Sequence, residues 1–369
     1  MTPELHRANL NTFTYNNTTR EGYLTDCISC YVTEERNGIF ELEAVFPAGG
    51  HLTDHIKVGS VIRTTHSFDV YDVKKNIKGL ITVRAAHISY RLLHIPVIYT
   101  SRNGLDRSIK MVLKNILLSA EEQTAYALGY SGNFSDIATD FRTGIKVPRS
   151  LKECLLGKEG SVVDRFGGEW SWRDDGATLF KERGTTHGIS GAIRYGHNMQ
   201  DLTYRANGEN IVTGILPYWA DSDGENVITG DIQYSDDAGS YTTPRTAVHN
   251  FSEDFQDQPT KDQLNAAAAA YVRAKLQTKP AETMQTRFVP LWQALDVSTA
   301  DLPAEQIKLC DTVPVIHEGY GISTTAKVVR VEYDALRERY TNIEIGTVQK
   351  RLEKMLAQTA NAAGVSLYV

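Results

Sequence analysis

Apolar and polar residues alternate along the first hundred positions in the manner of β-strands. Between residues 24 and 46 apolar side chains alternate with glutamates, and the dipeptide Asn37-Gly38 suits the positive backbone angles of a type I′ turn. This pattern predicts a hairpin with one buried and one solvated face. A second hairpin is predicted over 68–85, around the polar stretch 74–79. Residues 1–95 are therefore expected to form a β-rich domain.

A helical period replaces this alternation after Pro96. Apolar residues recur at steps of three and four from 105 to 117, which predicts an amphipathic helix. A short helix over 150–156 and two strands around the turn Asp174-Asp175-Gly176 are expected to follow. Residues 96–186 are therefore interpreted as an α+β domain.

Strand patterns return on both sides of a helical segment. Short strands, with Asp223-Gly224 as a hairpin turn, are expected over 187–245, and further strands are expected over 302–346. Because strands flank the helical segment, we interpret it as an insertion in one discontinuous β domain that long-range pairing closes.

The inserted segment, 246–301, has the pattern of a helix. Thr260 and Gln263 have the spacing of a capping box, an alanine run follows, and a proline closes the segment. The end of the chain, from 347 to 363, carries apolar residues along one side, which predicts a final amphipathic helix. Residues 246–301 and 347–369 are together interpreted as a helix-containing domain.

The strand and helix patterns together predict a multi-domain protein of the β-rich α+β class, and the composition is ordinary, without a sign of disorder. The 369 residues include 39 Lys and Arg against 45 Asp and Glu, a net charge of −6, which argues against a general binder of nucleic acid or anionic membranes. No stretch approaches the roughly 18 apolar residues of a membrane span, and the polar first 20 residues lack the apolar core of a signal peptide. We expect a soluble protein made in the cytoplasm, without stable membrane insertion.

Candidate metal ligands occur without the spacing that a metal site needs. Cys27 and Cys30 have redox or zinc spacing, but no second ligand pair exists, and opposite parity on a strand places them on opposite faces. With Cys154 and Cys310 they are too sparse for a disulfide framework, so free thiols are expected. The remaining histidine candidates, interpreted as ordinary or solvated residues, are His51 with His55, His187 and His197.

Candidate catalytic motifs fail in the same way. Residues 221–225 resemble a calcium loop but have glycine at the wrong position, and residues 188–192 approach a nucleophile elbow without its second glycine. The carboxylate pairs at 174–175 and 236–237 lie at expected turns, where Asp is favoured for its own backbone hydrogen bonds. No phosphate-binding loop or dinucleotide fingerprint is present. The sequence therefore predicts no catalytic, metal-binding or cofactor-binding residue, and no cofactor.

Several strings, taken in order, resemble the phage minor structural protein family, also called prophage endopeptidase tail, which is the hub part of tail-associated lysins. The similarity covers about residues 20–350. Where similar proteins carry Leu-Gly-Asp, this chain has Cys310 in place of the glycine, which puts the local turn in doubt. The strings are Glu34-Glu35-Arg36-Asn37-Gly38 with Phe46-Pro47, Phe68-Asp69-Val70 with Val83-Arg84-Ala85-Ala86-His87-Ile88, Phe166-Gly167-Gly168-Glu169-Trp170 with Tyr195-Gly196-His197-Asn198-Met199, and Leu309-Cys310-Asp311-Thr312-Val313.

The resemblance implies a multi-domain phage tail hub with two β-barrel domains plus α+β and helical inserted domains. Similar hubs are homotrimers at the distal tip of the tail tube, where six barrels adapt three-fold to six-fold symmetry. Residues 1–95 would be one barrel and 187–245 with 302–346 the other. The implied partners are the distal tail (ring) protein, the tape measure protein and the tail tube, with phage DNA passing through the lumen without specific binding.

The implied location is the distal tail tip of a virion assembled in the bacterial host. The family name implies a peptidase, but that activity resides in C-terminal extensions of longer members, and this chain ends at Val369. We therefore expect a structural protein and no enzyme. An acidic lumen wall would repel DNA phosphate, while mild acidity can equally serve solubility alone.

Three other functions remain as alternatives. One is a tail-associated cell-wall hydrolase, and another is the hub of a contractile phage-like injection device, which the same fold would serve. A receptor-binding protein is disfavoured because fibrous repeats are absent. Tyr218, Trp219 and Trp292 are candidates for an interface, but core positions are the preferred interpretation.

Overall fold

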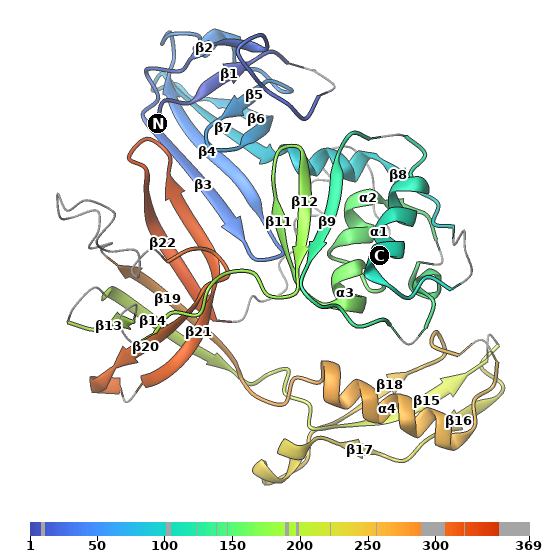
Figure 1. The fold of residues 1–369 in the computed structure, drawn as a ribbon. Coiled ribbons are helices and arrows are strands. Elements are labelled where there is room, and N and C mark those ends of the chain that lie inside the picture. The colour runs from blue at the N-terminus through green and yellow to red at the C-terminus, as the bar shows by residue number, and fades with distance from the viewer. Residues whose placement is uncertain are drawn as a thin grey trace. The chain divides into compact units, whose positions relative to one another are not determined.

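The structure is a computed structural model in which the chain forms two compact units (Figure 1). We call residues 204–283 the inserted unit and the rest of the chain the main unit. The helix predicted at 347–363 lies outside the described residues, and the division into four domains stays a prediction. The structure describes residues 1–346 apart from 9–11, 101–104, 123, 138, 146, 189–191, 197–198, 222, 256, 289–306 and 321.

A 13-stranded sheet runs through the main unit, in the order β14-β19-β22-β21-β3-β4-β7-β6-β5-β1-β2, with β20 beside β21 and β13 beside β20. Its N-terminal strands are β1 (Glu4–His6), β2 (Arg20–Tyr23), β3 (Ser29–Glu35), β4 (Phe40–Pro47), β5 (Val61–Arg63), β6 (Ser67–Lys75) and β7 (Leu80–His87). Its other strands are β13 (Ile193–Arg194), β14 (Met199–Asn207), β19 (Ala281–Phe288), β20 (Thr312–His317), β21 (Ile322–Asp334) and β22 (Arg339–Gly346).

The two predicted β-barrels are not found among the described residues. A barrel of the N-terminal strands would need the free edge of β3 to pair with a strand at the other end of that group. This edge pairs instead with β21, where Glu35 lies opposite Arg330. The two β-rich parts of the chain therefore continue into one open sheet whose ends, β14 and β2, do not pair. The β-rich α+β class is confirmed, and the barrel closure is wrong for this part of the chain.

The first hairpin forms as predicted, with a different turn. β3 and β4 pair antiparallel, and alternate residues of β4 from Phe40 to Phe46 are buried. Asn37 has a φ of 52°, but Gly38 is not left-handed, so the turn is not type I′. The Asn37 side chain instead spans to the α+β part, where Nδ2 donates to the Gly168 carbonyl and Oδ1 accepts from the Trp170 amide, both at 2.8 Å.

The second hairpin, β6 with β7, is also confirmed, and the chain then enters the α+β part. β11 and β12 form the hairpin predicted around residues 174–176, and β9 adds a parallel third strand. The side chains of Tyr126, Phe141 and Trp170 are buried in its core. The elements are the 3-10 helix η2 (Ile88–His94), β8 (Pro96–Val97), α1 (Ile109–Leu118), β9 (Ala127–Ser131), η3 (Phe141–Gly144), β10 (Arg149–Ser150), α2 (Leu151–Leu155), α3 (Val162–Phe166), β11 (Glu169–Trp172) and β12 (Gly176–Phe180).

The helices of this part begin where side-chain caps satisfy free backbone amides. The Ser108 hydroxyl accepts from the Met111 amide in the first turn of α1, so the helix begins at Ile109, four residues after Leu105. α2 is short but has a complete capping box between Ser150 and Glu153. Both predicted helices are therefore confirmed.

The inserted unit is a four-stranded sheet with a helix on one face. α4 (Lys261–Lys275) starts with the predicted capping box of Thr260 and Gln263, and its Leu264 packs in one cluster with Trp219 of β15. Gly224 has a φ of 72° in the predicted turn between β15 and β16. The strands are β15 (Gly214–Ala220), β16 (Val227–Thr229), β17 (Gln233–Tyr234) and β18 (Thr246–Asn250), with η5 at Asp236–Ser240.

The departure from the Leu-Gly-Asp string has a structural counterpart. Cys310 has a φ of 72°, a left-handed conformation that favours glycine. Its carbonyl faces Gly184, where an added Cβ would lie 2.4 Å from the Cys310 oxygen. The turn therefore keeps the geometry of a glycine at 310 although the side chain differs.

Candidate functional site

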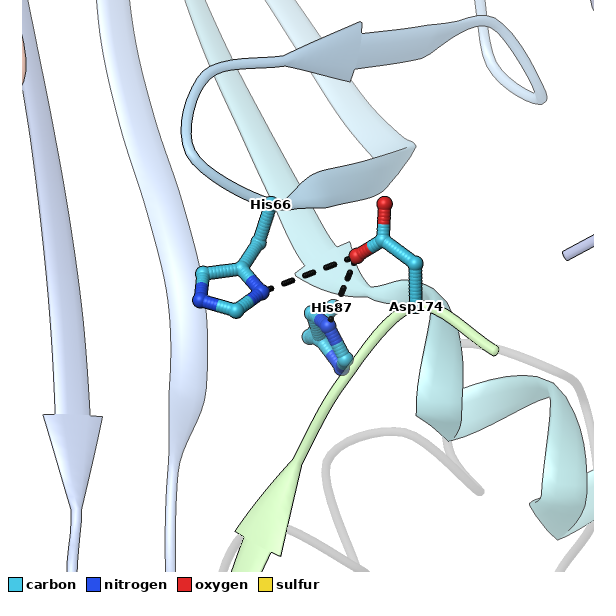
Figure 2. Close-up of side chains that lie close together, drawn as sticks. All are labelled: His66, His87 and Asp174. Carbon is cyan, nitrogen blue, oxygen red and sulfur yellow. Dashed lines mark ion pairs between the residues drawn. The ribbon is translucent and has the colours of Figure 1, made fainter. Parts of the chain in front are cut away.

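Three ionisable side chains from distant parts of the main unit meet where the α+β part contacts the sheet (Figure 2). His66 lies in the turn between β5 and β6, His87 ends β7, and Asp174 lies in the turn between β11 and β12. Asp174 Oδ1 is 3.6 Å from His66 Nδ1 and 3.4 Å from His87 Nε2. The site thus joins two turns and the end of a strand that are far apart in the sequence.

The Asp174 carboxylate is held in its charged form. The backbone amide and hydroxyl of Ser67 donate to its two oxygens at 3.1 and 2.6 Å. Burial by itself would raise the pKa of Asp174, but the interactions with His66, His87 and Ser67 outweigh it, so this pKa lies well below its usual range.

His87 is neutral at physiological pH. Its ring is fully buried and stacks on Phe40, with 4.3 Å between centroids and 15° between planes. Burial lowers the pKa of His87 to about 4, against the opposing attraction of Asp174. The Ser89 amide donates to Nδ1 at 3.3 Å, so the ring proton is on Nε2, the atom that faces Asp174.

Two imidazoles and a carboxylate are ligands that suit zinc, and the three ligand atoms lie within 4.8 Å of one another. A metal at Nε2 of His87 would require that nitrogen to lose its proton and Nδ1 to carry one. Nδ1 faces the N–H of Ser89, which is a donor and not the acceptor that a metal-bound histidine needs. The geometry therefore favours a partly buried polar link between the sheet and the α+β part over a metal site.

A second buried pair, Ser89 and Lys152, has the residue types of a hydrolytic dyad. Lys152 Nζ donates to Ser89 Oγ at 3.0 Å, and burial lowers the pKa of Lys152 well below its usual value. The exposed fractions of Ser89 and Lys152 are 0% and 7%. A substrate carbonyl has no access to this hydroxyl, so the geometry does not support nucleophilic chemistry here.

The histidine and cysteine candidates from the sequence take structural places. All four cysteines are free, as predicted. Cys27 precedes β3, so the expectation that it faces away from Cys30 is wrong: a hydrogen bond to Cys27 and burial together raise the pKa of Cys30. His55 pairs with Glu21 at 3.0 Å, which leaves no shared site with the exposed His51.

The remaining candidates divide between partnered residues and undescribed ones. His187 Nε2 lies 2.8 Å from the buried Asp311, a partner 124 residues away that spacing could not reveal. Trp219 is buried in the core, which confirms the interpretation preferred from the sequence, whereas Tyr218 of the same strand is partly exposed. The candidates His197 and Trp292, and Ser190 and Gly191 of the elbow-like string, lie outside the described residues.

The buried His87 should make the stability of the protein depend on pH in the acid range. Because its folded pKa of about 4 lies below the model-peptide value of 6.5, the unfolded chain binds the proton first as pH falls. The free energy of unfolding should therefore fall between pH 6.5 and 4 by up to about 1.4 kcal/mol per pH unit from this residue. The check is urea unfolding at several pH values.

The matched variant is His87→Asn, whose amide oxygen can accept from the Ser89 amide as a helix cap but does not titrate. The stability–pH slope of this variant should be smaller by about one proton, with a remaining slope from His6, whose pKa burial also lowers. His51→Asn, at an exposed histidine, should keep the wild-type slope. An unchanged slope in His87→Asn would contradict a neutral, buried His87.

Comparisons with known proteins identify the kind of protein that has this fold. Residues 187–356 match the model of the family described as Prophage endopeptidase tail. Prophage tail protein gp18 from Listeria monocytogenes is similar in structure, with a TM-score of 0.60, 16% identity, and coverage of 99% of this chain and 100% of that one. No curated protein sequence matches the chain.

Two further solved structures have the same fold at lower identity. The 43 kDa tail protein of prophage MuSo2 from Shewanella oneidensis has a TM-score of 0.57 and 9% identity, over 94% of this chain and 97% of that one. The tail protein from Neisseria meningitidis MC58 has a TM-score of 0.54 at the same identity and coverage. Among the described residues, every helix is too short or too polar to span a membrane.

The family match and the shared fold confirm the resemblance to the prophage endopeptidase tail family. They support a structural protein of a phage tail.

Proposed function

We propose that this protein is the tail-tip, or baseplate, hub of a bacteriophage or prophage. In this proposal three copies form a ring at the distal end of the tail tube, adapt its six-fold symmetry to three-fold, and open for DNA passage. The ring protein, the tape measure protein and the tube are its neighbours. The family match over residues 187–356 carries the proposal.

The sheet supports a role as one stiff building block. The matched part of the chain contributes β20, β21 and β22, and β21 pairs with the N-terminal β3 over five successive residue pairs, from Arg330 with Glu35 to Asp334 with Tyr31. Arg183 Nη1 adds a link at 3.1 Å to Glu34 on β3. Such continuity suits a subunit that holds a fixed geometry within a ring.

The solution mass tests the proposal. A subunit of 41.1 kDa should give about three times that mass by light scattering, with dissociation on dilution. Electron microscopy of the assembled particle with a ring partner should place the trimer at one end of a tube. A protein that is monomeric in solution and absent from purified tails would contradict the proposal.

The same preparation tests the hydrolase alternative. We propose that the chain itself has no cell-wall hydrolase activity, since the buried Ser89 and Lys152 pair lacks substrate access. Purified protein incubated with labelled peptidoglycan should release no soluble fragments. Release that persists in Lys152→Met would place the activity elsewhere in the chain, and release abolished by that change would overturn the burial argument.

A further inference from the structure

The net charge of the chain is concentrated in one unit. Residues 204–283 contain 12 Asp and Glu but only 6 Lys and Arg, a net charge of −6, which equals the net charge of the whole chain. The main unit sequence is therefore neutral overall, so a basic surface on it must be balanced by acidic residues elsewhere on the same unit.

Carboxylates gather at one end of the inserted sheet. β15 runs parallel to β18, and Ala220 at its end lies opposite Val227 of β16. The segments that leave these strand ends therefore lie together, and they carry the exposed Glu225, Glu253 and Asp254, which we call the acidic end. Among the residues that the structure describes, none forms an ion pair with these three.

Exposed apolar side chains adjoin the acidic end. Two valines lie on the same face of the sheet, because each is opposite a residue of the same parity on β15. Val227 is opposite Ala220, and Val248 is opposite Leu216. The exposed fractions are 55% for Val227 and 66% for Val248. This end of the inserted unit thus offers apolar area beside unpaired negative charge.

The β6–β7 hairpin has the opposite character. Its turn carries Ile77, whose exposed fraction is 104%, between exposed Lys75 and Lys78, and Lys74 precedes them. None of these three lysines forms an ion pair with a described residue. We call Lys74, Lys75, Ile77 and Lys78 the basic tip.

We propose that the basic tip of one copy binds the acidic end of the inserted unit of a neighbouring copy. Three ammonium groups face three carboxylates, and Ile77 packs near Val227 and Val248. Two different surfaces of the same chain make the contact head-to-tail, which closes into a ring when the rotation between copies permits. The inference rests on the proposed trimer and names one of its contacts.

Charge reversal on either side tests this contact, with the trimer dissociation followed by light scattering over a dilution series. Each triple reversal should weaken assembly by about 30-fold or more at low salt, because like charges then oppose each other. A chain that carries both reversals restores opposite charges and should recover to within about 5-fold of wild type. The reversals are Lys74→Glu, Lys75→Glu and Lys78→Glu on the tip, and Glu225→Lys, Glu253→Lys and Asp254→Lys on the acidic end.

Matched controls change the same amount of charge away from the contact. The control variant replaces three exposed basic residues on α1 and just before it by Glu: Arg107, Lys110 and Lys114. Its trimer dissociation constant should stay within about 3-fold of wild type, because only the net charge has changed. Circular dichroism melts should show that all variants fold. Substituting Ile77→Ser alone should weaken assembly without changing its salt dependence.

The outcomes separate this contact from the proposed function. A wild-type trimer whose dissociation is unchanged by both reversals would overturn the contact and leave the hub proposal standing. Weakened assembly in both reversals without recovery in the combined chain would also overturn the pairing. A wild-type protein that stays monomeric at every concentration would overturn this contact, and its absence from purified tails would then overturn the hub proposal as well.

Discussion

Asp174→Ala is expected to lower the free energy of unfolding by about 2–4 kcal/mol, since it removes the shared acceptor of a polar cluster built around the fully buried His87. The change leaves the Ser67 amide and hydroxyl without their partner, and it removes the carboxylate that lies 3.4 Å from Nε2 of the fully buried His87. Urea unfolding monitored by tryptophan fluorescence is a direct readout, because Trp172 and Trp170 lie on the adjoining strand β11.

The neighbouring carboxylate provides the control. Asp175 lies in the same turn, its side chain is 71% exposed, and its ion pair is with Arg173. Asp175→Ala should therefore change the free energy of unfolding by less than about 0.5 kcal/mol. Asp174→Asn keeps the shape and one acceptor oxygen, and its cost should be intermediate. A stability of Asp174→Ala within 0.5 kcal/mol of wild type would show that the cluster is not the link we describe.

Local elements of this fold could be predicted because their signals lie within a few residues. The capping boxes of Ser150 with Glu153 and Thr260 with Gln263 fixed the starts of α2 and α4. The alternation in β4 identified its buried face. The turn at Asn37 was placed correctly but assigned the wrong type, because the Asn37 side chain binds backbone 131 residues away. Tertiary contacts therefore override turn preference there.

The long-range features could not be predicted from the sequence. Pairing of β21 with β3 joins residues about 300 positions apart, and no local pattern specifies which edge meets which. The cluster combines His66, His87 and Asp174, of which only Asp174 stood out, as a turn residue. Its function as a link depends on two turns and a strand end that only the folded chain brings together. The same holds for Asp311 beside His187.

Lys152→Met is expected to raise the free energy of unfolding by about 2–4 kcal/mol at pH 7, because it relieves a buried amine of its desolvation cost. Lys152 is 7% exposed, and none of the described residues pairs a carboxylate with it. Its Nζ lies 3.1 Å from the centre of the Trp172 ring and donates to the Ser89 hydroxyl. Methionine keeps apolar packing on this ring and loses the hydrogen bond to Ser89 and the cation–π contact with Trp172.

The pH dependence distinguishes relief of desolvation from better packing. Burial lowers the folded-state pKa of Lys152 below its ordinary 10.5, so the unfolded chain binds the proton more readily and wild-type stability rises with pH toward 10.5. The advantage of Lys152→Met should therefore shrink between pH 7 and 10, by up to about 1.4 kcal/mol per pH unit. Lys114→Met, at an exposed site on α1, should show no such trend. A Lys152→Met protein less stable than wild type at pH 7 would show that the contacts of the ammonium group with Trp172 and Ser89 outweigh its burial.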